Sequence, residues 1–301
     1  MKILLLGPDG QVGWELRRAL APLGALHCLR RASTDGSLCG DLSQPEALAR
    51  TVRTLQPDIV VNAAAYTAVD KAESEQALAY VINAESPGRL AEEMASLGGW
   101  LVHFSTDYVF DGSGDSPRDE SADTAPLNVY GKSKLDGELR IAAAGANHLI
   151  LRTSWVHAAR GGNFARTMLR LAAERDSLNV IDDQVGAPTG ADLLADITAH
   201  AMRQAITDAA VSGTYHAAAA GAVSWYGYAR HVLDWARQRG VPLKTGSEAV
   251  SPISTRQYPT PAARPLNSRL DTQKLQRTFG LTLPPWQTGV ERMLAEVLAQ
   301  P

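Results

Sequence analysis

Gly7-Pro8-Asp9-Gly10-Gln11-Val12-Gly13 decides the fold, because this stretch stands between an apolar run and a helical pattern. Ile3–Leu6 before it predicts a buried strand, and Val12–Leu20 after it predicts an amphipathic helix. Glycine suits a turn with positive φ and lets the backbone approach a pyrophosphate, which a helix N-terminus attracts. The alternative is a tight turn without a ligand. We expect Gly10, Gln11 and Val12 to line a dinucleotide pyrophosphate, with Gly7 and Gly13 as further cofactor-binding residues.

The first half of the chain alternates apolar runs with helical periods. Further strands are expected at Leu26–Leu29, Asp58–Val61, Trp100–Phe104 and Leu149–Leu151. Helices are expected at Pro45–Leu55, Ala77–Leu97 with a break at Ser86-Pro87-Gly88, and Tyr130–Ala144. This alternation predicts an α/β fold with a Rossmann-type, doubly wound parallel sheet, in which residues 1–152 form the dinucleotide-binding domain.

The pattern loosens after residue 152 and predicts a smaller C-terminal substrate-binding lobe, residues 153–301, with segments that can cross back to the first domain. Helices are expected at Phe164–Ala173, Asp192–Ala205, Trp225–Gln238 behind the N-cap Ser224, and Thr288–Leu298. Gly240–Arg264 is rich in proline, serine and threonine, which predicts a loop.

The bulk composition excludes several classes of protein. The 301 residues are 45% hydrophobic and 20% charged, with a formal net charge of -3, so no basic patch points to nucleic acid. No apolar run could span a bilayer, and the first one is too short for a signal-peptide core. Cys28 and Cys39 match no disulfide or metal framework, which favours a reducing, cytoplasmic location.

The end of the second predicted strand bears on the choice of cofactor. An acid there would bind a ribose 2′-hydroxyl, but the sequence has Arg30 and Arg31, which suit a 2′-phosphate. This favours NADPH, with NADH as an alternative; two solvated arginines are an equal alternative. Asp41 and Leu42 are candidates for holding the adenine ring.

Tyr130 and Lys134 are the candidate catalytic pair, because residues four apart share one face of a helix. Reduction of a ketone needs an acid for the forming alkoxide, and a nearby ammonium is expected to lower the pKa of the phenol. Thr106 follows the Trp100–Phe104 strand, at the edge where open α/β sheets bind ligands, and its hydroxyl could orient the substrate oxygen.

With these residues in place, the sequence resembles the extended short-chain dehydrogenase/reductases and, within them, the dTDP-4-dehydrorhamnose reductase family. The resemblance covers nearly the whole chain. Besides the glycine loop, it is carried by Val61–Glu73, His103–Phe110, Pro126–Lys134, Arg152–Trp155, Asp183–Thr189 and Arg264–Leu270.

The resemblance implies a role for each of several residues. Thr106, Tyr130 and Lys134 would form the catalytic triad, with Lys134 also on the nicotinamide ribose. The nicotinamide would lie against Ala63, Ala64, Ala65 and Thr67. Val69 and Trp155 would pack on the sugar, and Asn163, Arg264 and Asn267 would lie near the nucleotide diphosphate. The alternatives are core packing for Trp155 and a solvated surface charge for Arg264.

Some members of the family are dimers with interfacial magnesium. The resemblance matches Glu15, Asp192 and Glu296 to a structural Mg²⁺ site in a possible homodimer, although Asp192 stands where glutamate is expected. The alternative is three solvated acids.

The implied activity is NADPH-dependent reduction of the C4 ketone of a dTDP-linked 4-keto-deoxysugar, the last step of dTDP-L-rhamnose synthesis. Another nucleotide-sugar reductase or epimerase, and a non-catalytic NADP-binding regulatory subunit, stay open. Fold alone does not separate them.

Overall fold

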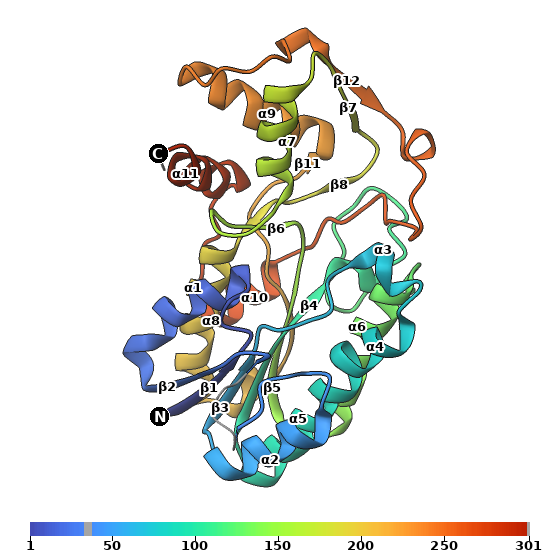
Figure 1. Ribbon diagram of the computed structural model, residues 1–301. Helices are drawn as coiled ribbons and strands as arrows, with labels where there is room; N and C mark the ends of the chain where they lie inside the picture. Colours follow the sequence, from blue (N-terminus) through green and yellow to red (C-terminus); the bar gives the residue numbers. More distant parts are fainter. Residues whose placement is uncertain (33–37, 300–301) are drawn as a thin grey trace.

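The computed structural model describes residues 1–32 and 38–299, arranged as a sheet lobe and a second lobe (Figure 1). The sheet has six strands in the order β10-β5-β4-β3-β1-β2, and all neighbouring pairs are parallel. The predicted Rossmann-type parallel sheet is confirmed. Its strands are β1 (Lys2–Leu6), β2 (Ala25–Leu29), β3 (Ile59–Asn62), β4 (Trp100–Thr106), β5 (Asn147–Thr153) and β10 (Gly213–His216).

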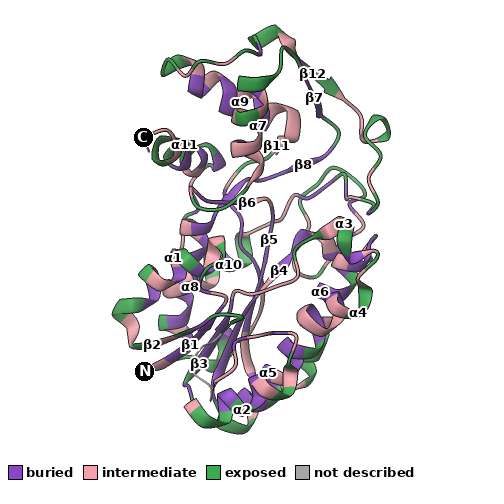
Figure 2. Cartoon of the chain, in the orientation of Figure 1, coloured by how far each residue is buried: buried purple, intermediate pink, exposed green. Residues whose placement is uncertain are grey.

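Helices cover both faces of the sheet because alternate strand residues point to opposite sides. Ile3 and Leu5 pack with α1 (Gln11–Leu20) and α8 (Ala191–Ala205). Leu4 and Leu6 pack toward the other face, whose helices are α2 (Pro45–Leu55), α5 (Ser86–Leu97) and α6 (Val129–Ala143). The central strands β1, β3, β4 and β5 are buried along most of their length, whereas the edge strand β2 is partly exposed (Figure 2).

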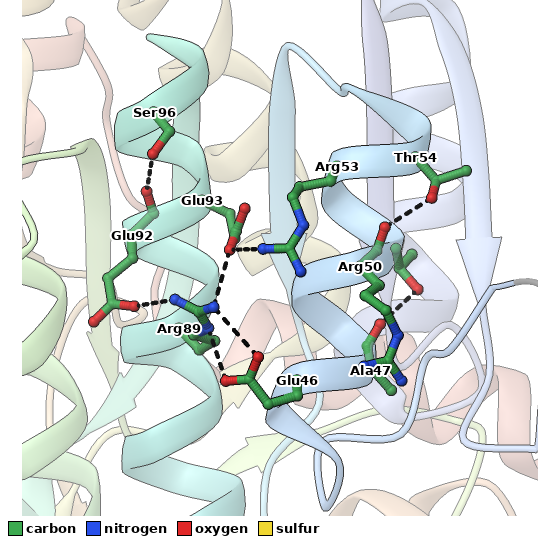
Figure 3. A network of polar contacts seen from close by, with 10 residues as sticks. Glu46, Ala47, Arg50, Arg53, Thr54, Arg89, Glu92, Glu93 and Ser96 are labelled. Atoms are coloured by element: carbon green, nitrogen blue, oxygen red, sulfur yellow. Dashed lines mark hydrogen bonds and ion pairs between the residues drawn. The ribbon is translucent and has the colours of Figure 1, made fainter.

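A network of charges joins α2 to α5 at the surface of this second face (Figure 3). Arg53 Nη1 donates to Glu93 at 2.6 Å, and Arg89 contacts Glu46 at 3.1 Å and Glu92 at 2.7 Å. Because the arginines and most of the acids are at least partly exposed, each pair adds little stability by itself. The network therefore fixes how the two helices align, while the apolar layer beneath them supplies most of the stabilisation.

The long helix expected over residues 77–97 has three parts. α4 (Gln76–Tyr80) runs into a π-helical turn, Val81–Glu85, and α5 follows with Pro87 in its first turn. Proline lacks an N–H and is tolerated at the start of a helix, so the change of helix type lets the chain continue through Ser86-Pro87-Gly88.

The second lobe packs around an aromatic cluster that includes Tyr228, Trp235 and Trp286. Its helices are α7 (Phe164–Glu174), α9 (Trp225–Gln238) and α11 (Trp286–Leu298). The short strands between or beside the lobes are β6 (Val156–His157), β7 (Leu178–Ile181), β8 (Val185–Gly186), β9 (Thr189–Gly190), β11 (Val223–Ser224) and β12 (Val250–Ile253). α3 (Val69–Ala72) lies at the edge of the sheet lobe that faces the second lobe (Figure 1).

Beyond residue 152 the structure contains short strands that were not predicted from the sequence. The expected loop Gly240–Arg264 contains β12, which pairs with β7 and buries Val250, so the loop prediction is wrong for those four residues. α8, β10 and α10 (Gln273–Phe279) belong to the sheet lobe, so segments from the later part of the chain cross back to it. None of the described helices is long and apolar enough to cross a membrane.

Candidate active site

The carboxyl ends of β1, β3, β4 and β5 meet at a cleft of about 840 Å³, which the second lobe closes from the other side. Ligands bind at this edge in open α/β sheets, so the fold itself places the cleft. The structure brings together here many of the residues expected from the sequence, which are Gly7, Gly10, Gln11, Val12, Ala63, Ala64, Ala65, Thr67, Val69, Thr106, Tyr130, Lys134 and Trp155.

The glycine loop is packed so tightly that two of its glycines admit no side chain. Gly7 has a φ of +75°, and a Cβ there would lie 2.9 Å from Ala64. A Cβ on Gly13 would lie 1.9 Å from the carbonyl oxygen of Gly7. Gly10 caps the N-terminus of α1, where free backbone N–H groups attract an anion. A side chain at Gly7 or Gly13 would therefore force the loop to shift.

Replacing Gly13 by alanine should weaken dinucleotide binding by about tenfold or more, or about 1.4 kcal/mol, because the loop must shift to admit the methyl group. Isothermal titration with NADPH measures the effect. Gly246→Ala is the matched control, since a Cβ there meets nothing within 4 Å. Unchanged affinity in a folded Gly13→Ala protein would contradict the role given to the loop.

Both arginines expected to bind a 2′-phosphate lie near the glycine loop and are exposed. Arg30 Nε lies 3.1 Å from Asp9, and Arg31 Nε lies 3.6 Å from Asp41. Leu42, in contrast, is 4% exposed and packs in the core below α2 and α5. The two arginines are exposed although each lies beside an aspartate, whereas the side chain of Leu42 is packed within the core.

The three candidate catalytic residues come from two elements. Thr106 ends β4, and Tyr130 and Lys134 lie one turn apart at the start of α6. Asn128 fixes that start, because its side chain caps the helix by accepting from the backbone N–H of Gly131 at 2.8 Å. Both hydroxyl groups and the amine therefore face one cleft from rigid supports.

The pKa of Tyr130 differs from the expectation. Enclosure of the phenol raises its pKa to about 12, against a smaller lowering by a hydrogen bond with Thr106. The expected lowering by Lys134 is wrong for this structure, because Lys134 Nζ instead contacts Phe104 O at 2.5 Å and His103 Nε2 at 3.1 Å. A raised pKa keeps the phenol protonated at neutral pH, which is the form that an acid needs for reduction.

Asp107 is a site residue that the sequence analysis missed. It is 2% exposed, lines the cleft, and accepts a hydrogen bond of 3.1 Å from the Thr106 hydroxyl. Burial raises the pKa of Asp107 to about 7, against smaller lowering by hydrogen bonds with Ser268 and Thr106. An acid directly after the Ser-Thr at a strand end was the available signal.

Asp107 should make the folding free energy depend on pH. A carboxyl with a raised pKa in the folded state stabilises the fold below its unfolded pKa, and this stabilisation is lost as pH rises toward 7. Asp107→Asn should therefore gain about 1 kcal/mol or more over the natural protein between pH 5 and pH 8. Urea unfolding at both pH values measures it; an equal difference at both would contradict the buried protonation.

A stacked pair of indoles forms the wall between the lobes. The rings of Trp155 and Trp225 lie 3.5 Å apart at an interplanar angle of 11°, and both residues line the cleft. Trp155 has a φ of +48°, which a non-glycine residue adopts only when its surroundings hold it. Trp155 thus faces the cleft and also packs on the aromatic cluster of the second lobe. The sequence analysis missed Trp225.

A second cleft of about 670 Å³ adjoins the first, and Tyr108 and Trp225 line both. Arg264 lies in this second cleft, where its guanidinium makes two hydrogen bonds with Asp70, at 2.7 and 3.0 Å. The pKa of Asp70 is lowered chiefly by this pair. Arg175 lines the same cleft, which therefore presents two guanidinium groups.

Two further expected residues lie outside both clefts. Asn163 caps α7 by accepting from Arg166 N at 3.1 Å and donates to Ala158 O. Asn267 is 2% exposed and donates to Ser116 O at 2.8 Å. Their side-chain amides are engaged in holding loops, and the structure does not bring them to the other candidate substrate residues.

The three acids matched to magnesium line one small hollow, but an arginine stands among them. Arg292 contacts Asp192 at 2.8 Å and Glu296 at 3.2 Å, while Glu15 pairs with Arg18 at 3.5 Å. Across residues 1–32 and 38–299, no group of three metal-binding side chains is arranged to hold an ion. The residues do not fit a Mg²⁺ site, because a guanidinium already supplies the positive charge.

Comparison with known proteins agrees with this geometry. A family model described as the RmlD substrate binding domain matches residues 1–299. A dTDP-4-dehydrorhamnose reductase of Escherichia coli K12 is 57% identical over 297 residues, covering 99% of this chain and 98% of that protein.

Solved structures give the same result. A dTDP-4-dehydrorhamnose reductase from Clostridium acetobutylicum is 34% identical, with a TM-score of 0.86 over 99% of this chain and 100% of that one. The enzyme from Bacillus anthracis, in complex with NADP, is also 34% identical with a TM-score of 0.86, over 98% and 100% of the two chains. The chain therefore belongs to the dTDP-4-dehydrorhamnose reductase family.

Proposed function

We propose that this protein reduces the C4 ketone of dTDP-4-dehydro-L-rhamnose with NADPH to give dTDP-L-rhamnose. One observation carries the proposal: a single cleft has a pyrophosphate-type glycine loop at one end and Thr106, Tyr130 and Lys134 at the other. The relatives that are dTDP-4-dehydrorhamnose reductases support the same substrate.

Tyr130, Thr106 and Lys134 would have separate roles in this reaction. The nicotinamide cofactor, when bound, supplies the hydride. Tyr130, neutral because of its raised pKa, donates its proton to the forming alkoxide at O4. Thr106 orients the same oxygen. Lys134 does not lower the pKa of the neutral Tyr130, since its Nζ contacts Phe104 O and His103, but its ammonium would be attracted to the phenolate once the proton has left Tyr130.

The second cleft would hold the nucleotide part of the substrate. It opens beside the first one at Trp225 and Tyr108, and the guanidinium groups of Arg175 and Arg264 would face the diphosphate. Asp70 would give up part of its contact with Arg264 when the diphosphate enters. The approximate size of the cleft, 670 Å³, is within the range of small-molecule sites.

NADPH is the proposed natural cofactor, supported by Arg30, Arg31 and the NADP complex of the Bacillus anthracis relative. Replacing both arginines by alanine should lower kcat/KM for NADPH by about tenfold or more, since a charge-assisted contact is lost. kcat/KM for NADH, which has no 2′-phosphate, should stay within about twofold in the same assay. Equal effects on both cofactors would overturn the preference.

NADPH oxidation at 340 nm tests the reaction itself. Consumption should require dTDP-4-dehydro-L-rhamnose and should be much weaker with the same sugar on UDP or GDP. Equal NADPH consumption with the dTDP-, UDP- and GDP-linked sugars would overturn the assigned substrate. No consumption with any of the three would overturn the proposed reductase activity. A cytoplasmic location and a homodimer stay predictions; Cys28 and Cys39 are both free thiols, which supports the former.

A further inference from the structure

A chain of hydrogen bonds runs from Lys134 to the end of β3, behind the cleft. Lys134 Nζ lies 3.1 Å from His103 Nε2, and His103 Nδ1 lies 3.1 Å from Asn62 Nδ2. Asn62 Oδ1 accepts a hydrogen bond of 3.2 Å from the backbone N–H of Ala64. Asn62, His103 and Lys134 are each 1% exposed, so their polar atoms need partners within the protein. Besides His103, Lys134 Nζ contacts Phe104 O at 2.5 Å, a bond that both the amine and the ammonium can donate.

The backbone N–H of Ala64 fixes which atoms donate and which accept along this series of hydrogen bonds. Because an N–H only donates, Asn62 must turn Oδ1 toward Ala64 and Nδ2 toward His103. An amide nitrogen also only donates, so His103 Nδ1 accepts and the ring proton lies on Nε2. Nε2–H then faces Lys134 Nζ, and only an unprotonated amine can accept that bond.

A protonated Lys134 requires the donors and acceptors between Lys134, His103 and Asn62 to be exchanged. An ammonium has no lone pair, so His103 must offer Nε2 as an acceptor and carry its proton on Nδ1. Nδ1–H then requires Asn62 to present its oxygen, which takes Oδ1 away from the N–H of Ala64. Ala64 lies against Gly7 and lines the cofactor cleft. The Ala64 end of this series of hydrogen bonds therefore lies where the dinucleotide is proposed to bind.

We propose that His103 is a positioning residue whose ring proton alternates between Nε2 and Nδ1 as Lys134 loses and gains its proton, with Asn62 turning over in step. His103 carries one ring proton in both forms, so the only net change is the proton on Lys134. Burial holds the pKa of His103 well below its ordinary value, which keeps the ring neutral. Burial also lowers the pKa of Lys134 to about 8, which brings the exchange close to neutral pH.

The other charged and polar groups near Lys134 do not take the place of His103. Glu138, one turn further along α6, favours the ammonium, but Arg152 on β5 pairs with it at 2.6 Å. Tyr130, one turn earlier, is neutral because its pKa is raised. The π-helical turn contributes the uncharged Asn83, which donates to Ser133, and Asp107 at the end of β4 bonds with Thr106. His103 is thus the group whose ring tautomer depends directly on the charge of Lys134.

Nitrogen-15 NMR of the imidazole rings in the intact protein tests the proposal without any assay of activity. From pH 6.5 to pH 9.5, His103 should change from the Nδ1–H to the Nε2–H tautomer, with a midpoint near pH 8. His216 is the internal control: its Nδ1 faces the carbonyl oxygen of Asp271 at 3.2 Å, and its pKa of about 3 keeps it neutral. Either tautomer persisting for His103 across this range would overturn the proposal.

Asn62→Asp tests the direction of the chain. A carboxylate accepts from Ala64 and from His103 Nδ1–H together, so it should lock His103 as Nδ1–H throughout the range. The matched control is Asn83→Asp, a carboxyl on a buried asparagine that contacts Tyr66 and Ser133 but not His103. It should keep the change of tautomer. A folded Asn62→Asp protein that also keeps it would overturn the proposal; the titration of the natural protein stands if the variant fails to fold.

The kinetic consequence rests on the proposed reduction. Loss of the Lys134 proton removes the charge that stabilises the Tyr130 phenolate, so kcat should fall as pH rises through about 8. In Asn62→Asp this fall should move up by about one pH unit or more, because a carboxylate at this position favours the protonated lysine. A change of tautomer without a kinetic counterpart would overturn the role of Lys134 in the reaction and leave the coupling of His103 to Lys134 intact.

Discussion

Replacing Tyr130 by phenylalanine should lower kcat by about 10² or more, because the variant cannot protonate the alkoxide at O4. The affinity for NADPH should stay within a few-fold, since only one hydroxyl is removed from a site that the glycine loop dominates. Initial rates of NADPH oxidation at saturating substrate, with a separate binding titration, measure both quantities.

Tyr228→Phe is the matched control for this variant. Tyr228 is also buried, and its hydroxyl has no hydrogen-bond partner among the described residues, but it lies in the aromatic cluster of the second lobe. Its loss should leave kcat within about twofold, as expected for a hydroxyl outside the reacting centre. Near-normal turnover in Tyr130→Phe would show that another group supplies the proton.

The largest effect on stability is expected at the buried ion pair of Arg152 and Glu138. Two nitrogens of Arg152 bond the carboxylate, with a shortest distance of 2.6 Å, and the side chains are 7% and 5% exposed. Arg152→Met should cost about 3–5 kcal/mol of unfolding free energy, because it leaves a buried carboxylate without its partner. Urea unfolding at pH 7 measures the loss.

An exposed pair of the same chemistry provides the comparison. Arg170 and Glu174 lie 3.1 Å apart on α7, with side chains 60% and 55% exposed. Arg170→Met should change the unfolding free energy by about 0.5 kcal/mol or less. The double variant Arg152→Met with Glu138→Leu should recover much of the loss, since no unpaired charge remains. A small effect of Arg152→Met alone would contradict the importance of burial at this pair.

The features that were predicted correctly from the sequence are those that depend on a local pattern of residues. The strand before Gly7, the helix after it and the shared face of Tyr130 and Lys134 are all encoded within a few neighbouring residues, so period and glycine spacing were enough. Strands β10 and β12 were missed because each is four residues long and is stabilised by pairing with distant strands, β5 and β7.

The candidate site was incomplete in the sequence for the same reason. Arg264 and Asp70 are 194 residues apart and meet only through the fold. Trp155 and Trp225 are far apart in the sequence and stack only in the fold. His103 contacts Asn62 and Lys134 only because β3 and α6 bring them to it. The pKa of Tyr130 was predicted in the wrong direction because sequence spacing reveals neither the enclosure of the phenol nor the contacts of Lys134 Nζ with Phe104 and His103.

Transfer of a labelled hydride tests the proposed reaction most directly. The protein would be mixed with NADPH deuterated on the reactive face of nicotinamide C4 and with dTDP-4-dehydro-L-rhamnose, and the product would be examined by proton and deuterium NMR. We expect dTDP-L-rhamnose with deuterium at C4 of the sugar from the natural protein, and a rate of incorporation at least about 10² lower in Tyr130→Phe. Deuterium at another carbon, or unlabelled sugar recovered from an enzyme that binds both ligands, would contradict it.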